Sequence, residues 1–383
     1  MKNAFSARIW GAASLAAAAL VATPVCAANI TVRDWGVTEK GVPVQLYTLK
    51  GARGLEARIT NFGAVLTDLI VPTRDGRKVD ILLGFDDFKS YERGGVYGAL
   101  IGRYAGRISR GGSFTLNGKT YQLQKTNPDA RFVIHGGTAR FHRKLWHAEM
   151  KDGVEPSLSL TMASPDGDGG FPGLLVTTVT YTMTRDNGLK IDYQAVAPQT
   201  TIANLTNHAY FALQGEGNGD ISSQTLQVFA DRFTPQDADN LVTGEIASVE
   251  GTPLDFRKPK RLGDVLTLPY PQIAMRRGID ISMIINGKPG TLRPAARLVD
   301  SGTGVAMDVL TTQPAMQVYS HNVGAGSSVG KGGKTYRAFY ALCLETEGYL
   351  DAVNQPHFPS PEVGPGKPMH EVTIFRFSTA TPK

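Results

Sequence analysis

The sequence predicts an all-β protein in which residues 28–383 fold as one large β-sandwich. Apolar residues alternate with polar ones in several segments, Asn-Gly and Asp-Gly pairs separate such segments, and no segment keeps a helical period over three turns. Glycine (43 residues) and proline (22 residues) are dispersed along the chain, as many short strands and turns require. There is no internal repeat or low-complexity linker, so we expect a single domain, with residues 324–334 as its most flexible loop.

The alternation is clearest in residues 158–162, 179–183 and 189–195, each of which is typical of a half-buried strand. The apolar positions are Leu158, Leu160 and Met162, then Val179, Tyr181 and Met183, then Leu189, Ile191, Tyr193 and Ala195. Hairpins are predicted at Asn117-Gly118 and Asn187-Gly188. Asn-Gly favours the type I′ turn because both of its central residues take positive φ. Asp75-Gly76 and Asn286-Gly287 are weaker signals of the same kind.

Residues 1–27 are predicted to be a secretory signal peptide. Lys2 and Arg8 begin it, an apolar stretch follows over residues 9–21, and small residues at 25–27 supply a cleavage site. The apolar stretch is too short to span a bilayer, and no later segment is long and apolar enough to do so. We therefore expect a periplasmic or secreted protein with no membrane anchor after leader removal. A lipid anchor on Cys26 is the open alternative.

The net charge does not indicate a nucleic-acid partner. The formal charge is +6, and loss of Lys2 and Arg8 with the leader lowers it by two, to +4. The remaining basic residues are scattered, with no dense run, and the cysteine and histidine spacings match no zinc motif. Of the two cysteines, Cys26 leaves with the leader. Cys343 lies in an apolar segment, where we expect a buried and inert thiol.

His208 and Glu345 are the strongest candidates for chemistry. His208 lies within residues 204–211 among amide and hydroxyl side chains, where an imidazole is suited to carry a proton near neutral pH. Glu345 ends the mostly apolar run 338–345, and a carboxylate there is costly to bury unless something uses it. Together they predict a general acid/base pair that needs no cofactor and no metal.

Other polar residues are candidates on weaker grounds. His135 precedes Gly136-Gly137, where the backbone can approach a ligand closely, and Asp280 is an isolated charge among apolar neighbours. Arg103 and Arg107 are each interpreted either as a donor of paired hydrogen bonds to hydroxyl groups or as part of a surface ion pair. We expect His142 to be a loop or surface residue, His357 only to pack, and Asp166 and Asp168 to form a turn.

A series of segments, spread in order over nearly the whole mature chain, resembles the aldose 1-epimerase (galactose mutarotase) family. They are residues 61–64 (NFGA), 101–108 (IGRYAGRI), 135–137 (HGG), 164–167 (SPDG), 204–211 (NLTNHAYF), 312–314 (TQP) with Gln317, 344–346 (LET) and 351–356 (DAVNQP). The resemblance implies a galactose mutarotase-like β-supersandwich. It also implies an enzyme that interconverts the α and β anomers of free aldohexoses such as glucose and galactose, as a monomer or homodimer.

The resemblance further implies roles for single residues. Glu345 matches the family's catalytic base and His208 its catalytic acid. Five residues match positions that hold the sugar hydroxyls and ring oxygen: Arg107, His135, Tyr210, Asp280 and Gln317. Gly106 stands where the family usually has an asparagine that touches substrate, so one sugar contact is expected to differ.

The implied chemistry fits these residue types. A hemiacetal inverts at C1 when the C1 hydroxyl loses a proton, the ring oxygen gains one, and the open aldehyde turns about the C1–C2 bond before closure. Positioned acid and base groups each typically contribute about 10²–10⁴-fold. His208 must carry its proton while Glu345 is ionised, so we expect Glu345 to have the lower pKa. We expect a rate optimum near neutral pH.

The chain departs from the family pattern beyond Gly106. Ile281 replaces a common histidine, Asp168-Gly169 a pair of glutamates, Glu347 a glutamine and Leu350 a proline. None of these removes the acid/base pair. Glu347 places a second carboxylate near Glu345, and like-charge repulsion is expected to raise the pKa of Glu345.

Three other functions stay open on the sequence alone. A non-catalytic carbohydrate-binding module would use the same pocket but would not need both His208 and Glu345. A glycoside hydrolase would use Asp280 and Glu345 as paired carboxylates. An epimerase of hexose phosphates would need a basic pocket for the phosphate group.

Overall fold

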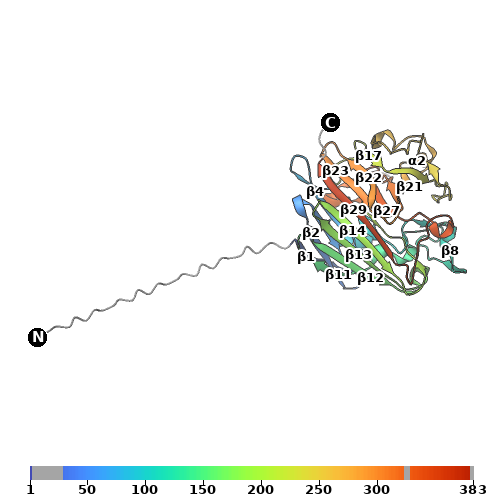
Figure 1. The fold of residues 1–383 in the computed structure, drawn as a ribbon, viewed down its shortest axis with the longest axis horizontal. Coiled ribbons are helices and arrows are strands. Elements are labelled where there is room, and N and C mark those ends of the chain that lie inside the picture. The colour runs from blue at the N-terminus through green and yellow to red at the C-terminus, as the bar shows by residue number, and fades with distance from the viewer. Residues whose placement is uncertain (2–28, 323–327, 380–383) are drawn as a thin grey trace.

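The computed structural model describes residues 1, 29–322 and 328–379, so the predicted signal peptide and its cleavage site lie outside the described residues apart from Met1. In the described part the chain consists mainly of antiparallel strands (Figure 1). The two α-helices there are short: α1 (Phe88–Arg93), which Asp87 caps through its side chain, and α2 (Pro271–Ala274). The all-β prediction is confirmed. Neither of these two helices has the length and apolar character needed to cross a membrane.

A nine-stranded antiparallel sheet runs through the middle of the molecule (Figure 1). In spatial order its strands are β11 (His147–Lys151), β12 (Ser157–Ser164), β13 (Leu175–Thr184), β14 (Gly188–Val196), β29 (Met369–Thr379), β23 (Val305–Thr311), β22 (Arg293–Val299), β17 (Thr225–Val228) and β20 (Lys260–Arg261). The last strand, β29, pairs with β14 on one side and β23 on the other. The end of the chain therefore joins the two halves of this sheet.

The three segments with the clearest alternation are β12, β13 and β14, as predicted. Along β13 every second residue is buried, including Val179, Tyr181 and Met183. The N-terminal sheet contributes to the same apolar core. Its strands are β1 (Ile30–Val37), β2 (Pro43–Lys50), β3 (Glu56–Thr60), β4 (Leu66–Pro72) and β5 (Lys78–Asp80). The Tyr181 hydroxyl donates to the Ala64 carbonyl at 2.7 Å, so this buried polar group is also satisfied.

A third sheet of five strands carries much of the pocket described below. Its order is β19 (Ala247–Ser248), β18 (Ala230–Thr234), β21 (Asp280–Ile285), β24 (Ala315–Tyr319) and β27 (Cys343–Glu347). Two-stranded ladders complete the fold: β6 (Ala99–Ile101) with β16 (Thr206–His208), β7 (Arg107–Ile108) with β10 (Val133–Ile134), β8 (Ser113–Leu116) with β9 (Lys119–Gln122), β15 (Thr201–Ile202) with β28 (Glu362–Val363), and β25 (Ser328–Val329) with β26 (Thr335–Tyr336).

The predicted turns are partly right. Asn117 (φ 50°) and Gly118 (φ 75°) join β8 and β9 in the expected two-residue turn. The turn type predicted at Asn187-Gly188 is wrong, because Gly188 already pairs with Thr184 and leaves a three-residue loop in which Asn187 alone has positive φ. Asn286-Gly287 forms no hairpin, since β21 and β22 belong to different sheets.

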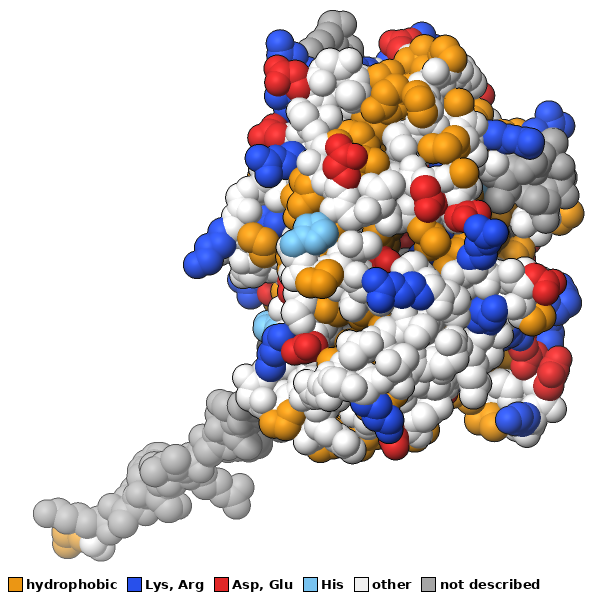
Figure 2. Space-filling view, turned by 90° about the vertical axis from the view of Figure 1, so that its right-hand side faces the viewer, with side chains coloured by type: hydrophobic (Ala, Val, Ile, Leu, Met, Phe, Trp, Pro, Cys, Tyr) orange, Lys and Arg blue, Asp and Glu red, His pale blue; other side chains and the backbone are white. Residues whose placement is uncertain are grey.

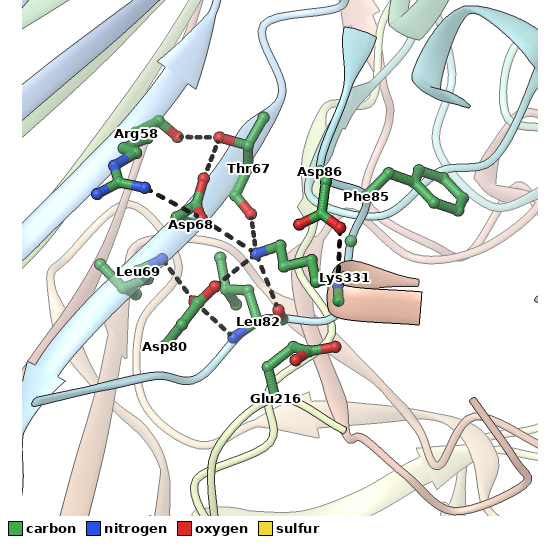
Figure 3. Close-up of polar contacts among 12 residues, drawn as sticks. Arg58, Thr67, Asp68, Leu69, Asp80, Leu82, Phe85, Asp86, Glu216 and Lys331 are labelled. Carbon is green, nitrogen blue, oxygen red and sulfur yellow. Dashed lines mark hydrogen bonds and ion pairs between the residues drawn. The ribbon is translucent and has the colours of Figure 1, made fainter. Parts of the chain in front are cut away.

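Residues 324–327 of the segment predicted to be the most flexible loop lie outside the described residues. The rest of that segment, residues 328–334, is well anchored, which corrects the expectation for this part. Lys331 is buried, and its Nζ lies 2.5 Å from Asp80 Oδ2, 2.6 Å from the Thr67 carbonyl and 3.4 Å from Asp68 Oδ1 (Figure 3). Burial alone would lower the pKa of Lys331, but the two aspartates more than offset it and raise the pKa. An ammonium group thus ties this segment to β4 and β5.

Candidate active site

A pocket of about 240 Å³ lies beside β7, β16, β21, β24 and β27. It is lined by all eight residues that the resemblance places at the site: Gly106, Arg107, His135, His208, Tyr210, Asp280, Gln317 and Glu345. Val96, Ile134, Tyr319, Glu347 and Leu350 complete the lining. Residues from distant parts of the sequence therefore meet in one cavity, and their individual roles stay predictions.

The third sheet presents its polar side chains to the pocket by simple strand geometry. Gln317 on β24 pairs with Glu345 on β27, and Asp280 on β21 pairs with Tyr319. Side chains two positions apart on a strand share a face, so Glu347 faces the pocket together with Glu345. Thr346 between them points the other way, toward Thr373 on β29.

His208 is held from the opposite side by β16. It pairs with Ala99 on β6, and the preceding Asn207 donates to the Gly98 carbonyl at 2.8 Å. The imidazole stacks on the ring of Tyr210, with centroids 4.8 Å apart and an angle of 10° between the planes. Its Nε2 atom lies 3.5 Å from Glu345 Oε2, and both side chains are almost completely buried. The geometry brings a carboxyl and an imidazole together where a substrate would enter.

His135 and Gly106 hold each other in place. The His135 amide donates to the Gly106 carbonyl at 3.0 Å, and the Gly106 amide donates to His135 Nδ1 at 3.3 Å. Burial lowers the pKa of His135 well below its usual value, so the ring is neutral and, with Nδ1 accepting, its proton is on Nε2. His135 thus offers the pocket a neutral hydrogen-bond donor.

Asp280 is oriented by three neighbours. Gln317 Nε2 donates to its Oδ1 at 2.5 Å, Asn240 Nδ2 to its Oδ2 at 3.5 Å, and Arg107 Nη2 lies 3.6 Å from Oδ2. Arg107 therefore forms an ion pair that lines the pocket and not the surface, so a surface ion pair is wrong, and its role as a hydrogen-bond donor to hydroxyl groups stays a prediction. Asn240 is a contact that the sequence did not single out.

The pKa order expected for Glu345 and His208 is reversed. Burial raises the pKa of Glu345 well above its usual value, and the nearby Glu347 and Asp280 raise it further. The repulsion predicted from Glu347 is therefore confirmed. Burial lowers the pKa of His208 to about 3. Removal from water disfavours both charged forms, so the pair holds one proton, on Glu345.

Asn204 connects the two walls of the pocket. Its Oδ1 accepts a hydrogen bond from the Gly348 amide at 2.8 Å, just after β27, and its Nδ2 donates to the Ala105 carbonyl at 3.2 Å, just before Gly106. Asn204 is buried, so these bonds are shielded from water. The role of Asn204 in the motif 204–211 is thus to hold the segments after β27 and before Gly106 in position.

Several of the weaker candidates lie outside this pocket. Arg103 is fully buried and donates to the carbonyls of Pro172 and Gly173 and to the Thr201 hydroxyl, so both interpretations offered for it are wrong. His142 is half-buried, and His357 is exposed, where its ring bonds the Gly244 carbonyl. Asp168 lies in a short 3₁₀ turn, Asp168–Gly170, as expected, and pairs with Lys144.

Sequence reasoning missed Tyr319 as a pocket residue. Alternation along β24 was the available signal, since Tyr319 is two residues after Gln317. Val96 lies outside the helices and strands, and Ile134 ends the two-residue strand β10, which is too short to show an alternation, so neither carries a comparable signal.

One group of side chains here could in principle ligate a metal ion. His208, Cys343 and Glu345 offer one ligand atom each within 4.8 Å of one another, and all three are buried. Burial raises the pKa of the Cys343 thiol well above its usual value, as expected for the inert buried cysteine predicted. A metal would have to displace protons from Cys343 and Glu345 to bind there.

Comparison with known proteins identifies the family. The family model of aldose 1-epimerase matches residues 45–376. The chain is 41% identical to galactose mutarotase of Bos taurus over 330 residues, which cover 85% of this chain and 92% of that protein. It is 32% identical to aldose 1-epimerase of Escherichia coli (strain K12), over 88% of this chain and 96% of that one.

The chain belongs to the aldose 1-epimerase family. It is accordingly an isomerase of the aldose 1-epimerase class, which interconverts the anomers of aldoses. Solved structures agree on the fold. The galactose 1-epimerase of Lactobacillus acidophilus NCFM superposes with a TM-score of 0.81 at 25% identity, over 92% of this chain and all of that one. An aldose epimerase homologue from C. elegans gives 0.79 at 28% identity, over 87% and 98%. The predicted galactose mutarotase-like fold is confirmed.

Proposed function

We propose that this aldose 1-epimerase acts on free aldohexoses such as galactose and glucose, with Glu345 as the base and His208 as the acid. The observation that carries the proposal is the 3.5 Å separation of Glu345 Oε2 and His208 Nε2 in a buried, polar pocket. A general base and acid must reach, from two sides, the hydroxyl that loses a proton and the ring oxygen that gains one.

Contacts with the sugar favour the charged forms of Glu345 and His208. A C1 hydroxyl that donates to the Glu345 carboxylate, and a ring oxygen that accepts from His208 Nε2, each favour the charged form of the residue they contact. Glu345 and His208 hold one proton between them in either arrangement, so sugar binding only has to move that proton from Glu345 to His208. Glu345 then takes the C1 proton as His208 protonates the ring oxygen, and the roles reverse on closure after the C1–C2 bond has turned.

The remaining polar groups hold the ring during opening. His135 offers a neutral donor, and Arg107 offers the fork of a guanidinium, which Asp280 keeps aimed into the cavity. Fixing the sugar in place while one bond rotates lets ring closure compete with escape of the open aldehyde.

The charge of the pocket favours neutral sugars over hexose phosphates. Asp280, Glu345 and Glu347 line it together with Arg107, the one lysine or arginine among its described lining residues. Asp280 already pairs with Arg107, so the pocket offers a phosphate group little net positive charge. This argues against the hexose-phosphate alternative.

The site of action is proposed from residues 1–27, whose basic start, apolar stretch and small residues fit a cleaved leader. We expect the mature chain in the periplasm or outside the cell. Fractionation of expressing cells, followed by N-terminal sequencing of the exported protein, would find a start near Ala28. A chain in the cytoplasm that still begins at Met1 would refute export.

The first experiment is polarimetry on freshly dissolved α-D-glucose and α-D-galactose. Wild type, Glu345→Gln and the matched control Glu149→Gln, whose exposed carboxylate lies on β11, are compared at equal concentration. We expect fast equilibration with wild type and control, and a loss of about 10²–10⁴-fold in Glu345→Gln. A Glu345→Gln rate equal to wild type would remove Glu345 from the mechanism. A wild-type rate no faster than the spontaneous one on either sugar would point to the binding-module alternative.

A further inference from the structure

Glu347 lies inside the pocket but has no part in the acid/base chemistry proposed above. It is 1% exposed and lines the cavity beside Arg107, Asp280 and Glu345. Its Oε2 atom is buried without a hydrogen-bond partner among the described residues. An unpaired buried oxygen costs free energy, and such an atom in a binding pocket is explained when the ligand supplies the missing partner.

The wall next to Glu347 is shaped by two further residues. A Cβ atom at Gly106 would stand 2.1 Å from Leu350 Cδ2, so Leu350 occupies the space that a side chain at position 106 would need. Glu347 Oε1 lies 3.8 Å from the same point. Gly106 and Leu350 have no polar side-chain group. Of these three residues, Glu347 is therefore the one whose side chain can form a hydrogen bond with a hydroxyl group.

The charges around Glu347 leave it suited to contact a neutral hydroxyl group. Burial raises the pKa of Glu347 to about 8, although Arg107 lowers it, and Asp280 raises it further. Glu345 on the same strand and Tyr104 are the other titratable groups that face it. At neutral pH the carboxyl therefore holds a proton and can both donate and accept a hydrogen bond.

We propose that Glu347 binds one ring hydroxyl of the aldose directly and selects for sugars that carry this hydroxyl. The inference rests on the proposed function and deepens it, by assigning a specificity-determining contact at the position where Gly106 provides none. Glu347 acts on substrate binding, while Glu345 and His208 act on the protons.

The test combines changes in the protein with changes in the sugar. Mutarotation rates are measured over a range of concentrations with galactose or glucose, whichever wild type converts faster, and with its monodeoxy derivatives, each lacking one hydroxyl other than that at C1. The variants are Glu347→Ala, Glu347→Gln and the exposed control Glu149→Ala. Thermal melting of each variant confirms that it is folded.

We expect Glu347→Ala to lose about tenfold in kcat/KM on the parent sugar, mainly through KM, as for one hydrogen bond removed. On one monodeoxy derivative the loss disappears, because the partner hydroxyl is already absent. Glu347→Gln keeps a donor and an acceptor and stays within about threefold of wild type at pH 7. Above pH 8 the wild-type carboxyl ionises and its KM rises, whereas the KM of Glu347→Gln does not.

An equal loss on every derivative would show that Glu347 only supports the pocket, and no loss on any sugar would show that it makes no contact. Either result overturns the inference. If wild type proves inactive, the proposed function fails separately. Calorimetric titration of the same sugars into the same variants then tests the contact of Glu347 with the sugar. The Kd of Glu347→Ala must be weakened for the parent sugar and unchanged for one monodeoxy derivative.

Discussion

Replacing Lys331 by methionine tests whether a buried charge cluster stabilises the fold. Lys331 is 8% exposed, and its ammonium group contacts Asp80, Asp68 and the Thr67 and Leu82 carbonyls (Figure 3). Methionine fills a similar volume but leaves the partly buried carboxyl of Asp80 without its cation. Removing one partner of a buried ion pair typically costs about 3–5 kcal/mol, which is the loss expected in the free energy of unfolding at pH 8, where Asp80 is ionised in wild type.

The size of the loss depends on pH in a direction set by Asp80. Burial raises the pKa of Asp80 to about 6 even with Lys331 present, and removing the cation raises it further. The unfolded value is about 3.9, so the folded state binds this proton more tightly, and stability is lost as pH rises through the folded pKa. The deficit of Lys331→Met should therefore be larger at pH 8 than at pH 5.

Urea unfolding at both pH values measures the effect, with two comparison variants. In Lys331→Met/Asp80→Asn no buried charge is left at position 80, and the amide oxygen introduced there can still accept from the Leu69 and Leu82 amides, so most of the loss is recovered. The control Lys367→Met breaks a half-exposed pair with Glu362 and should change stability by less than about 1 kcal/mol. A Lys331→Met deficit below about 1 kcal/mol, or no recovery in the double variant, would refute the reasoning.

Three further outcomes are expected. Asn204→Ala removes two buried hydrogen bonds that join the pocket walls. Urea unfolding should show a loss of stability of about 1–3 kcal/mol for each backbone group left without a partner, and polarimetry should show a lower kcat. An unchanged kcat would show that Asn204 does not position the pocket residues. The pH–rate profile should be flat from about pH 4 to neutrality, in place of the optimum near neutral pH expected from the sequence, because burial lowers the pKa of His208 to about 3 and raises the pKa of Glu345. The rate should fall at alkaline pH, where the proton shared by Glu345 and His208 is lost. A rate still rising below about pH 4 would contradict an ionised Glu345 as the base. Dialysis against EDTA should leave the mutarotation rate unchanged, since the proposed steps use only side chains; restoration of a lost rate by added Zn²⁺ would instead implicate the group His208, Cys343 and Glu345.

The surface shown in Figure 2 agrees with the sequence-based view of charge. Lysine and arginine side chains are interspersed with aspartate and glutamate on the face drawn there. A nucleic-acid surface would show one continuous basic area, and this face has none. The absence of a dense basic run can be seen in the sequence without knowledge of the fold.

Strands were predictable where one face is buried and the other is not. Alternation in β12, β13 and β14 follows directly from their position in the large sheet, with every second side chain in the core. β27 was predicted differently, since all five of its residues are buried and no alternation is visible. There the signal was a carboxylate at the end of an apolar run, which singled out Glu345 but could not show what offsets the cost of burying it.

The electrostatics of the site could not be predicted from local sequence. Glu347 was recognised as a neighbour of Glu345 along the chain, and that part of the reasoning held because a strand places both on one face. The pKa of His208 depends instead on burial by segments far away in sequence, including strand β6 and the ring of Tyr319. Arg103 shows the same limit: its partners come from residues 172, 173 and 201, so its neighbours along the chain gave no indication that it is structural.

The neutral state of Glu345 and His208 follows from their burial. In water a glutamate would ionise and a histidine would titrate near neutrality, so the pair would change its proton count within the working range of pH. Burial moves the pKa of His208 down and that of Glu345 up, which keeps one shared proton over a wide range of pH. A reaction that takes one proton from the C1 hydroxyl and gives one to the ring oxygen requires that Glu345 and His208 hold one proton between them. In the proposed mechanism the pocket therefore holds the pair in its neutral form, and contacts of the C1 hydroxyl and ring oxygen of the sugar would determine which of the two residues carries the proton.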